Sequence, residues 1–197
     1  MAIRSKIYQS EYPYHLFNRT NNKEFLFDLP QVFPMFRDTL RYIALQLHVD
    51  LHHFILLNNH FHLIASFAEN NLAEFMQRFQ SCFSKTFNTL SNRINHIFGG
   101  RYGATVVMSQ EYLCHLIRYV YQNATHANKW TLQSNYPYSS LPLYSDGQWK
   151  TFGLKLDPYI RGLPSEEQIS QILQLSQVGL QENELDHLER KLKKRFI

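Results

Sequence analysis

Apolar and polar residues follow two different periods along the first 127 residues of the chain. Four short runs rich in aromatic and β-branched residues predict strands, at residues 14–19, 52–57, 60–67 and 104–108. Only an Asn-Asn pair separates the second run from the third, and asparagine tolerates the positive φ angles of a tight turn. We therefore expect these two runs to form a hairpin.

Three longer stretches repeat their apolar residues every three or four positions, which is the period of an amphipathic helix. They span residues 31–48, the segment 72–90 with Asn71 as its capping residue, and residues 111–127. The resulting order of strand, helix, hairpin, helix, strand and helix is typical of an α+β fold. We expect a ferredoxin-like antiparallel sheet with helices on one face, followed by a C-terminal helical extension.

The chain is long enough for one substantial core with a C-terminal appendage. Of the 197 residues, we assign 1–130 to a main domain, 131–164 to an irregular wrap rich in aromatic residues, and 165–197 to a helical basic tail. The tail is expected to start with a helix at Ser165, because the acidic and amide residues after this serine form a capping sequence.

Charge is partitioned along the chain, although the net charge is only +4. Residues 1–155 carry 14 Lys and Arg against 9 Asp and Glu, residues 156–189 carry one Arg against 7 acids, and residues 190–197 carry a charge of +5. A basic main domain is compatible with a nucleic-acid partner. A charge of this size is equally typical of an ordinary solvated surface, so charge alone leaves both interpretations open.

Composition favours an intracellular protein. The two cysteines, Cys82 and Cys114, lack the spacing of a disulfide framework or of a thiolate zinc site. No apolar run resembles a signal peptide or reaches the length of about 18 residues that a membrane span needs. We expect a soluble cytoplasmic protein with no membrane partner.

Two histidines of the third predicted strand are candidates for a metal site. His60 and His62 are two positions apart, so their side chains point to one face of the strand while Phe61 points to the other. Two neighbouring imidazoles can share a metal ion. The chain contains ten histidines, however, and most exposed strand histidines bind nothing, so spacing by itself favours a chance pair.

The helix predicted over residues 111–127 carries a second candidate group. At 3.6 residues per turn, Tyr119 and Asn123 lie together on one flank of its buried stripe. A phenol has a pKa near 10 and is a weak nucleophile, so attack on a phosphate by Tyr119 needs a cation to polarise the target. A metal bound by His60, His62 and Asn123 would supply that cation. The alternative is a half-buried tyrosine that only packs its ring and hydrogen-bonds its hydroxyl.

Five motifs occur in the order seen in REP-associated tyrosine transposases, which belong to the single-tyrosine HUH transposases. The chain resembles these proteins over residues 12–145. The resemblance is specific, because an Asn-His-apolar-His-Leu run is followed on a later helix by an Arg-Tyr pair. The motifs are YHLFNRTNNKEFLF (14–27), FILLNNHFHLIA (54–65), FGGRYGATVV (98–107), YLCHLIRYVYQNATHA (112–127) and YPYSSLPLY (136–144).

The resemblance implies a role for each residue of the candidate site. His60 and His62 match the metal-binding histidines of the family, and Tyr119 matches its catalytic tyrosine. Asn123 matches the polar residue that completes the metal site. The chain departs from the family in having Ala124 where proline is common, a change that removes no catalytic atom.

The reaction implied by the resemblance is metal-dependent cleavage and strand transfer of single-stranded DNA that contains hairpins. The tyrosine forms a 5′-phosphotyrosine link and releases a 3′-hydroxyl, and no nucleotide cofactor is needed. We expect Mg²⁺ or Mn²⁺ as the metal, and phosphate contacts from Arg19 and Arg101. Related transposases include dimers and single-chain forms, and the tail after residue 145 favours a monomer.

Two other interpretations fit the sequence. The first is a domesticated protein that binds DNA hairpins without catalysis. The second is a structural or RNA-binding protein in which His60 and His62 are ordinary surface histidines. Hairpin binding without a covalent DNA adduct would favour the first, whereas metal-independent stability with no preference for single-stranded DNA would favour the second.

Overall fold

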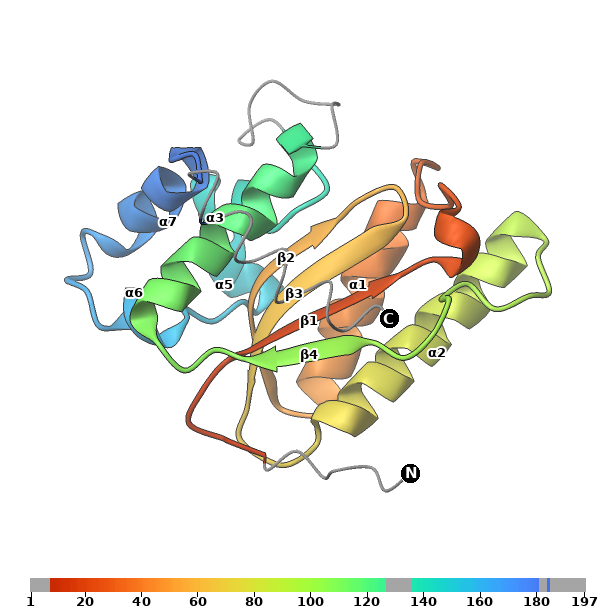
Figure 1. Cartoon of the computed structure of the whole chain (residues 1–197), viewed down its shortest axis with the longest axis horizontal. Coiled ribbons are helices and arrows are strands. Elements are labelled where there is room, and N and C mark those ends of the chain that lie inside the picture. The colour runs from red at the N-terminus through yellow and green to blue at the C-terminus, as the bar shows by residue number, and fades with distance from the viewer. Residues whose placement is uncertain (1–7, 127–135, 181–183, 185–197) are drawn as a thin grey trace.

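An antiparallel sheet of four strands lies at the centre of the protein (Figure 1). The structure is a computed structural model that describes residues 8–126, 136–180 and 184. All four predicted strands are present, and the second and third form the expected hairpin. The strands follow the order β2-β3-β1-β4 across the sheet, with bounds Tyr14–Arg19 for β1, Val49–Leu56 for β2, His60–Phe67 for β3 and Gly103–Val106 for β4.

The turn between β2 and β3 is held by hydrogen bonds to the segment that follows β1. The carbonyl oxygen of Asn58 accepts a hydrogen bond from Phe27 N at 2.9 Å, and that of Asn59 accepts one from Thr20 N at 2.8 Å. Neither asparagine has a positive φ angle. The turn therefore does not use the conformational freedom that we expected of this pair, because long-range hydrogen bonds fix it instead.

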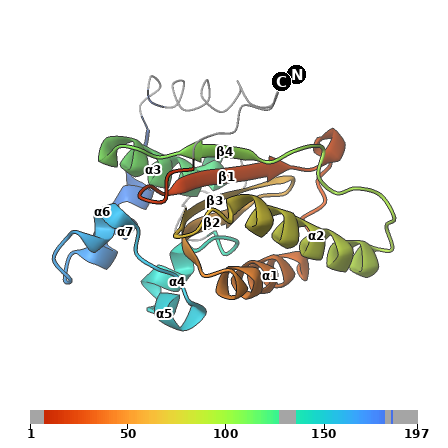
Figure 2. The ribbon, with the colours of Figure 1, turned by 90° about the horizontal axis from the view of Figure 1, so that it is seen from below.

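The three long helices cover both faces of the sheet (Figure 2). On one face, the ring of Phe61 from β3 contacts the rings of Phe36 and Phe79, with centroids 5.7 and 5.6 Å apart. The next residue of β3, His62, points to the opposite face and contacts Tyr119. The helices are α1 (Val32–Gln46) and α2 (Leu72–Ser91), which share the first face, and α3 (Gln110–His126), which covers the second.

The order of the elements from β1 to β4 agrees with the predicted ferredoxin-like α+β fold. The prediction of helices on one face holds for α1 and α2, whereas α3 lies on the other face. The reason is that the hairpin strands are apolar on both faces. Ile55 and Ile64, which share the face of His62, are fully buried, and an apolar face must be covered.

After α3, the described chain runs along the outer edge of β2. Leu56 N donates to Tyr138 O, and Ser140 N donates to Phe54 O, both at 2.9 Å. This pairing covers backbone groups that an open edge would expose. The segment predicted to be an irregular wrap contains three short helices, which are α4 (Leu141–Ser145), α5 (Trp149–Phe152) and α6 (Pro158–Arg161).

The last described helix, α7 (Gln168–Gln177), packs against α3. It begins later than the capping sequence at Ser165 predicts. The basic residues 190–197 lie outside the described residues. The boundaries of the three predicted regions therefore stay a prediction.

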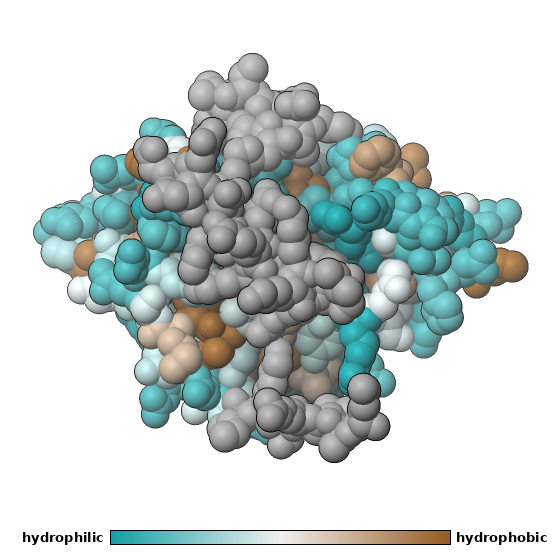
Figure 3. All heavy atoms as spheres, in the orientation of Figure 1, coloured by the Kyte–Doolittle hydropathy of each residue, from teal (hydrophilic) through white to brown (hydrophobic). Residues whose placement is uncertain are grey.

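The buried hydrophobic residues form one cluster around the sheet. On the surface shown in Figure 3, hydrophobic patches are small and separated by hydrophilic residues. Among the described residues, the large hydrophobic residues with the greatest exposure are Ile94 (97%) and Phe25 (70%). In the part of the chain that the structure describes, no helix combines the length and apolar character needed to cross a membrane.

Gly103 of β4 lies against the ring of Phe17, its pairing partner on β1. A Cβ atom at this position would lie 2.2 Å from Phe17 Cζ, and the buried Phe17 ring is packed against His15 and His62. We expect Gly103→Ala to lower the free energy of unfolding by about 1–3 kcal/mol, as overpacking does in other cores. The melting temperature should fall by roughly 2–4 °C for each kcal/mol.

Gly100→Ala is the matched control for Gly103→Ala. At position 100, no atom lies within 4 Å of the place that a Cβ would occupy. Thermal unfolding followed by circular dichroism should therefore show a clear loss of stability only for the variant at position 103. Equal melting temperatures for the two variants would contradict the close packing of Phe17 on Gly103.

Candidate functional site

Strand register places the two histidines of β3 opposite two residues of β1. His60 pairs with Arg19, and His62 pairs with Phe17. Residues directly opposite one another in an antiparallel pair share a face of the sheet, so these four side chains lie on the side of α3. His15, two positions before Phe17, lies on the same face.

The helix α3 brings Tyr119 and Asn123 to these histidines. Tyr119 is partly buried, and its ring meets the ring of His62 edge-on with centroids 5.4 Å apart. The rings of His60 and His62 are 5.3 Å apart and nearly perpendicular, at 87°. One turn further along α3, the Asn123 side chain hydrogen-bonds the His60 ring. The four side chains therefore lie in one cluster, to which β3 and α3 of the same chain each contribute two residues.

Hydrogen bonds define the tautomer of His60. Asn59 Nδ2 donates to Lys23 O at 3.0 Å, which turns Asn59 Oδ1 toward His60 Nδ1 at 2.7 Å. An amide oxygen can only accept, so His60 Nδ1 carries the proton and Nε2 carries a lone pair. Asn123 Nδ2 donates to Tyr119 O at 2.6 Å, and the Asn123 amide oxygen could bind a metal ion in place of the contact that this side chain makes with the His60 ring.

His62 is held by a second buried histidine. His62 Nδ1 lies 2.9 Å from His15 Nε2, and both residues are buried. Within the described part of the chain, the other ring nitrogen, His62 Nε2, is buried and has no hydrogen-bond partner. If His62 Nδ1 donates to His15, a lone pair is left on His62 Nε2, which is the form in which this nitrogen could bind a metal ion.

Both histidines of β3 are neutral at physiological pH. Burial and the nearby Arg19 guanidinium lower the pKa of His60 to about 3. Burial and the adjacent His15 hold the pKa of His62 well below its ordinary value of 6.5. The neutral imidazole is the form that binds metal ions. At neutral pH the cluster therefore offers two imidazole nitrogens and one amide oxygen.

These groups fit a divalent metal ion with mixed nitrogen and oxygen ligands. Among the described residues, no three His, Cys, Asp or Glu side chains are close enough to hold a metal ion, and the Asn123 amide oxygen is a further group that could act as a ligand. Mg²⁺ prefers oxygen ligands, whereas Mn²⁺ also accepts imidazole. Three protein ligands leave coordination positions for water or for phosphate oxygens.

The two candidate phosphate-binding arginines lie toward the end of the sheet that carries His60. Arg19 is the last residue of β1 and is close enough to His60 to depress its pKa. Arg101 is exposed and precedes β4. Its neighbour Gly100 accepts a hydrogen bond from Asn18 Nδ2 through its carbonyl oxygen, at 3.1 Å. Arg19 therefore borders the cluster directly, and Arg101 lies on a neighbouring loop.

Sequence spacing did not single out two residues that hold the histidines, Asn59 and His15. A signal was present for His15, because alternation along β1 puts His15, Phe17 and Arg19 on one face. Asn59 directly precedes His60, but its contact with the ring depends on the turn. The supporting residues are therefore visible only once the pairing of β1 with β3 is known.

Comparison with known proteins identifies similar sequences and folds. The family described as IS200-like transposases matches residues 8–123, which is more than half of the chain. A REP-associated tyrosine transposase bound to a REP hairpin has a similar fold, with a TM-score of 0.63 and 14% sequence identity over 80% of this chain and 93% of that chain. At this identity the similarity is one of fold.

Two further solved structures are more distant in fold. A candidate transposase from Deinococcus radiodurans has a TM-score of 0.44 and 16% identity, covering 61% of this chain and 95% of that chain. The tRNA(His) guanylyltransferase of Saccharomyces cerevisiae has a TM-score of 0.46 and 14% identity, covering 88% of this chain and 73% of that chain. No curated protein sequence matches the chain.

Proposed function

Because the chain belongs to the family of IS200-like transposases, we propose that its Tyr119 cleaves single-stranded DNA and stays covalently attached to the cut strand. The observation that carries this proposal is the contact of the Tyr119 ring with the pair formed by His60 and His62. A tyrosine beside two neutral imidazoles and an amide oxygen is suited to metal-assisted attack on a phosphodiester.

Mg²⁺ or Mn²⁺ is the proposed cofactor, and its ligands would be His60, His62 and Asn123. A bound divalent ion would withdraw charge from a non-bridging oxygen of the scissile phosphate. The role of the surrounding chain is to orient the ligands. Asn59 holds the His60 ring and His15 holds the His62 ring, so both imidazoles are kept in fixed orientations.

The proposed cleavage step exchanges one phosphate ester for another. The hydroxyl oxygen of Tyr119 bonds to phosphorus, the bond between phosphorus and the 3′ oxygen breaks, and the phenol proton ends on the departing 3′-hydroxyl. The product on the protein is a 5′-phosphotyrosine. Attack by another 3′-hydroxyl reverses the exchange, frees Tyr119 and joins two strands. No nucleotide cofactor is consumed, because the energy of the ester bond is conserved.

Single-stranded DNA that contains a hairpin is the proposed substrate. Support comes from the structurally similar REP-associated transposase, which was solved bound to a REP hairpin. Arg19 borders the cluster where the scissile phosphate would lie. In this proposal, Arg19 and Arg101 neutralise phosphates and so release counterions from the DNA.

Covalent trapping tests the proposal. End-labelled single-stranded DNA with hairpins from the source genome is incubated with the protein and Mn²⁺ or Mg²⁺, and the products are separated on a denaturing gel. We expect a heat-stable adduct that EDTA prevents, and mass spectrometry of the digested adduct should place the nucleotide on Tyr119. Hairpin binding without any adduct would instead favour the non-catalytic DNA-binding protein.

A mixing experiment tests whether one chain is sufficient for catalysis. Tyr119 contacts His62 of its own chain, so a chain that lacks either residue has an incomplete site. We expect a mixture of Tyr119→Phe and His62→Ala proteins to form no more DNA adduct than either variant alone. Recovery of adduct formation in the mixture would show that α3 is exchanged between chains, and would contradict a self-sufficient chain.

A further inference from the structure

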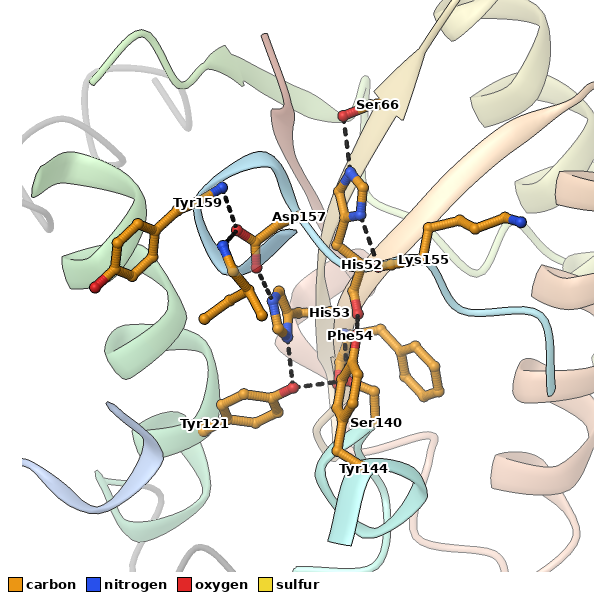
Figure 4. A network of polar contacts seen from close by, with 11 residues as sticks. His52, His53, Phe54, Ser66, Tyr121, Ser140, Tyr144, Lys155, Asp157 and Tyr159 are labelled. Atoms are coloured by element: carbon orange, nitrogen blue, oxygen red, sulfur yellow. Dashed lines mark hydrogen bonds and ion pairs between the residues drawn. The ribbon is translucent and has the colours of Figure 1, made fainter. Parts of the chain in front are cut away.

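A network of buried hydrogen bonds connects α3 to β2 and to the segment that follows α3 (Figure 4). His53 Nδ1 lies 2.7 Å from the Tyr121 hydroxyl, and His53 Nε2 lies 2.9 Å from Asp157 Oδ2. The Tyr121 hydroxyl also lies 2.9 Å from Ser140 Oγ. All four residues are buried, and none of them takes part in the proposed reaction.

The chemistry of the groups sets the direction of these hydrogen bonds. The Asp157 carboxylate can only accept, so His53 Nε2 donates to it. The other carboxylate oxygen accepts from Tyr159 N and Ile160 N, at 3.0 and 3.1 Å, and so caps α6. Burial raises the pKa of Tyr121, which keeps its hydroxyl protonated and able to donate to His53 Nδ1. Each polar group of this hydrogen-bond network therefore has a matching partner.

Tyr121 occupies a position on α3 from which it can control the candidate site. It lies two residues after Tyr119 and two residues before Asn123, on the opposite flank of the buried stripe. Holding the Tyr121 hydroxyl therefore fixes the rotation of α3 about its axis. The partner that holds it, His53, lies on β2, which pairs directly with the strand that carries His60.

Two of the partners lie beyond the match to IS200-like transposases, although Ser140 falls within the last of the five motifs that resemble REP-associated transposases. That match ends at residue 123, whereas Ser140 and Asp157 belong to the chain after α3. Ser140 also accepts from Phe54 N at 2.9 Å through its hydroxyl oxygen, which ties it to β2. The C-terminal segment thus contributes two side chains to the link between the helix and the sheet.

We propose that His53, Ser140 and Asp157 are positioning residues that act through Tyr121 to keep Tyr119 and Asn123 turned toward the histidines of β3. The inference rests on the proposed function, in which Tyr119 is the nucleophile. It assigns a role in the reaction to the segment after α3. A displacement of about 1 Å at a reacting group can slow a reaction by about 100-fold, so loss of this link should slow the attack without weakening DNA binding.

A matched control is available in Tyr144, a second buried tyrosine of the same region. Its hydroxyl donates to His52 O at 2.6 Å, which joins α4 to β2, and its ring, which phenylalanine would keep, contacts the ring of His53 at 5.5 Å. Tyr144→Phe and Tyr121→Phe each remove one buried hydroxyl. Both variants should lose stability, but only Tyr121→Phe should allow α3 to rotate about its axis.

The experiment compares full-length wild type, Tyr121→Phe and Tyr144→Phe by three measurements. These are hydrogen exchange of the α3 amides, the dissociation constant for hairpin DNA, and the rate of adduct formation in a single turnover. For Tyr121→Phe we expect faster exchange in α3, unchanged DNA affinity and a rate lowered at least about tenfold. For Tyr144→Phe we expect the exchange of α3 and the rate to stay at the wild-type values.

Equal slowing by the two variants, or unchanged exchange in α3 of Tyr121→Phe, would overturn the positioning role. Hydrogen exchange needs no reaction, so it tests the link even if the wild type forms no adduct and the proposed function fails. Ser140→Ala serves as a second variant if Tyr121→Phe does not fold, because it removes the other partner of the Tyr121 hydroxyl. Ser140→Ala should also speed hydrogen exchange of the α3 amides and lower the rate of adduct formation.

Discussion

Tyr119→Phe should abolish covalent attachment of DNA and leave hairpin binding unchanged. The substitution removes the oxygen that attacks phosphorus but keeps the ring that packs against His62. Removal of a nucleophile commonly costs a factor of about 10⁶ in rate, so the adduct should fall below detection on a denaturing gel. Affinity for the same hairpin, measured by fluorescence anisotropy, should not change, because phosphate contacts dominate binding.

The control for this prediction is Tyr42→Phe. Tyr42 is 56% exposed and belongs to α1, on the opposite face of the sheet. This variant should form the adduct at the wild-type rate. An adduct that survives in Tyr119→Phe would assign the attack to another residue and would refute the proposed nucleophile.

Removal of either histidine of β3 should abolish metal binding and, with it, metal-dependent cleavage. In His60→Ala and His62→Ala the proposed site loses one of only two imidazoles. Loss of residues that merely support metal ligands costs about 10–100-fold in affinity, so loss of a ligand should cost at least about 100-fold. Titration calorimetry with Mn²⁺ measures the affinity, and the covalent adduct assay measures the consequence.

Melting temperatures separate ligand loss from unfolding in this experiment. His62 is buried and His60 is partly exposed, so His62→Ala should destabilise the fold more than His60→Ala. Loss of metal affinity should nevertheless be similar in the two variants. His48→Ala, which removes an exposed histidine outside the cluster, should keep the wild-type affinity for Mn²⁺. Unaltered Mn²⁺ binding in both His60→Ala and His62→Ala would refute the assignment of these histidines as metal ligands.

The local elements could be predicted from the sequence because each short segment carries its own period. The run 14–19 coincides with β1, and α3 spans Gln110–His126 where the period predicts 111–127. Alternation along a strand and the 3.6-residue turn of a helix are properties of backbone geometry. They also place His60 beside His62 on one face, without any knowledge of the fold.

The assembly of the candidate site could be predicted only in part. Helical spacing puts Tyr119 and Asn123 on one flank of α3, but it does not say which face of the sheet this helix covers. The resemblance to a transposase family, carried by the five motifs, supplied the expectation that these residues act with the histidines. The orientations of the histidine rings depend on Asn59 and His15, and those contacts follow from the turn and from strand pairing.

By itself, the sequence determined the strands, the long helices, the α+β class and the residue types that can hold a metal ion and attack a phosphate. The tertiary structure alone decided that α3 covers the face opposite α1, that His15 supports His62, and that His53 meets Asp157 across 104 residues of chain. The physical reason is that periodicity depends on neighbouring residues, whereas these contacts depend on which apolar surfaces pack together when the whole chain excludes water.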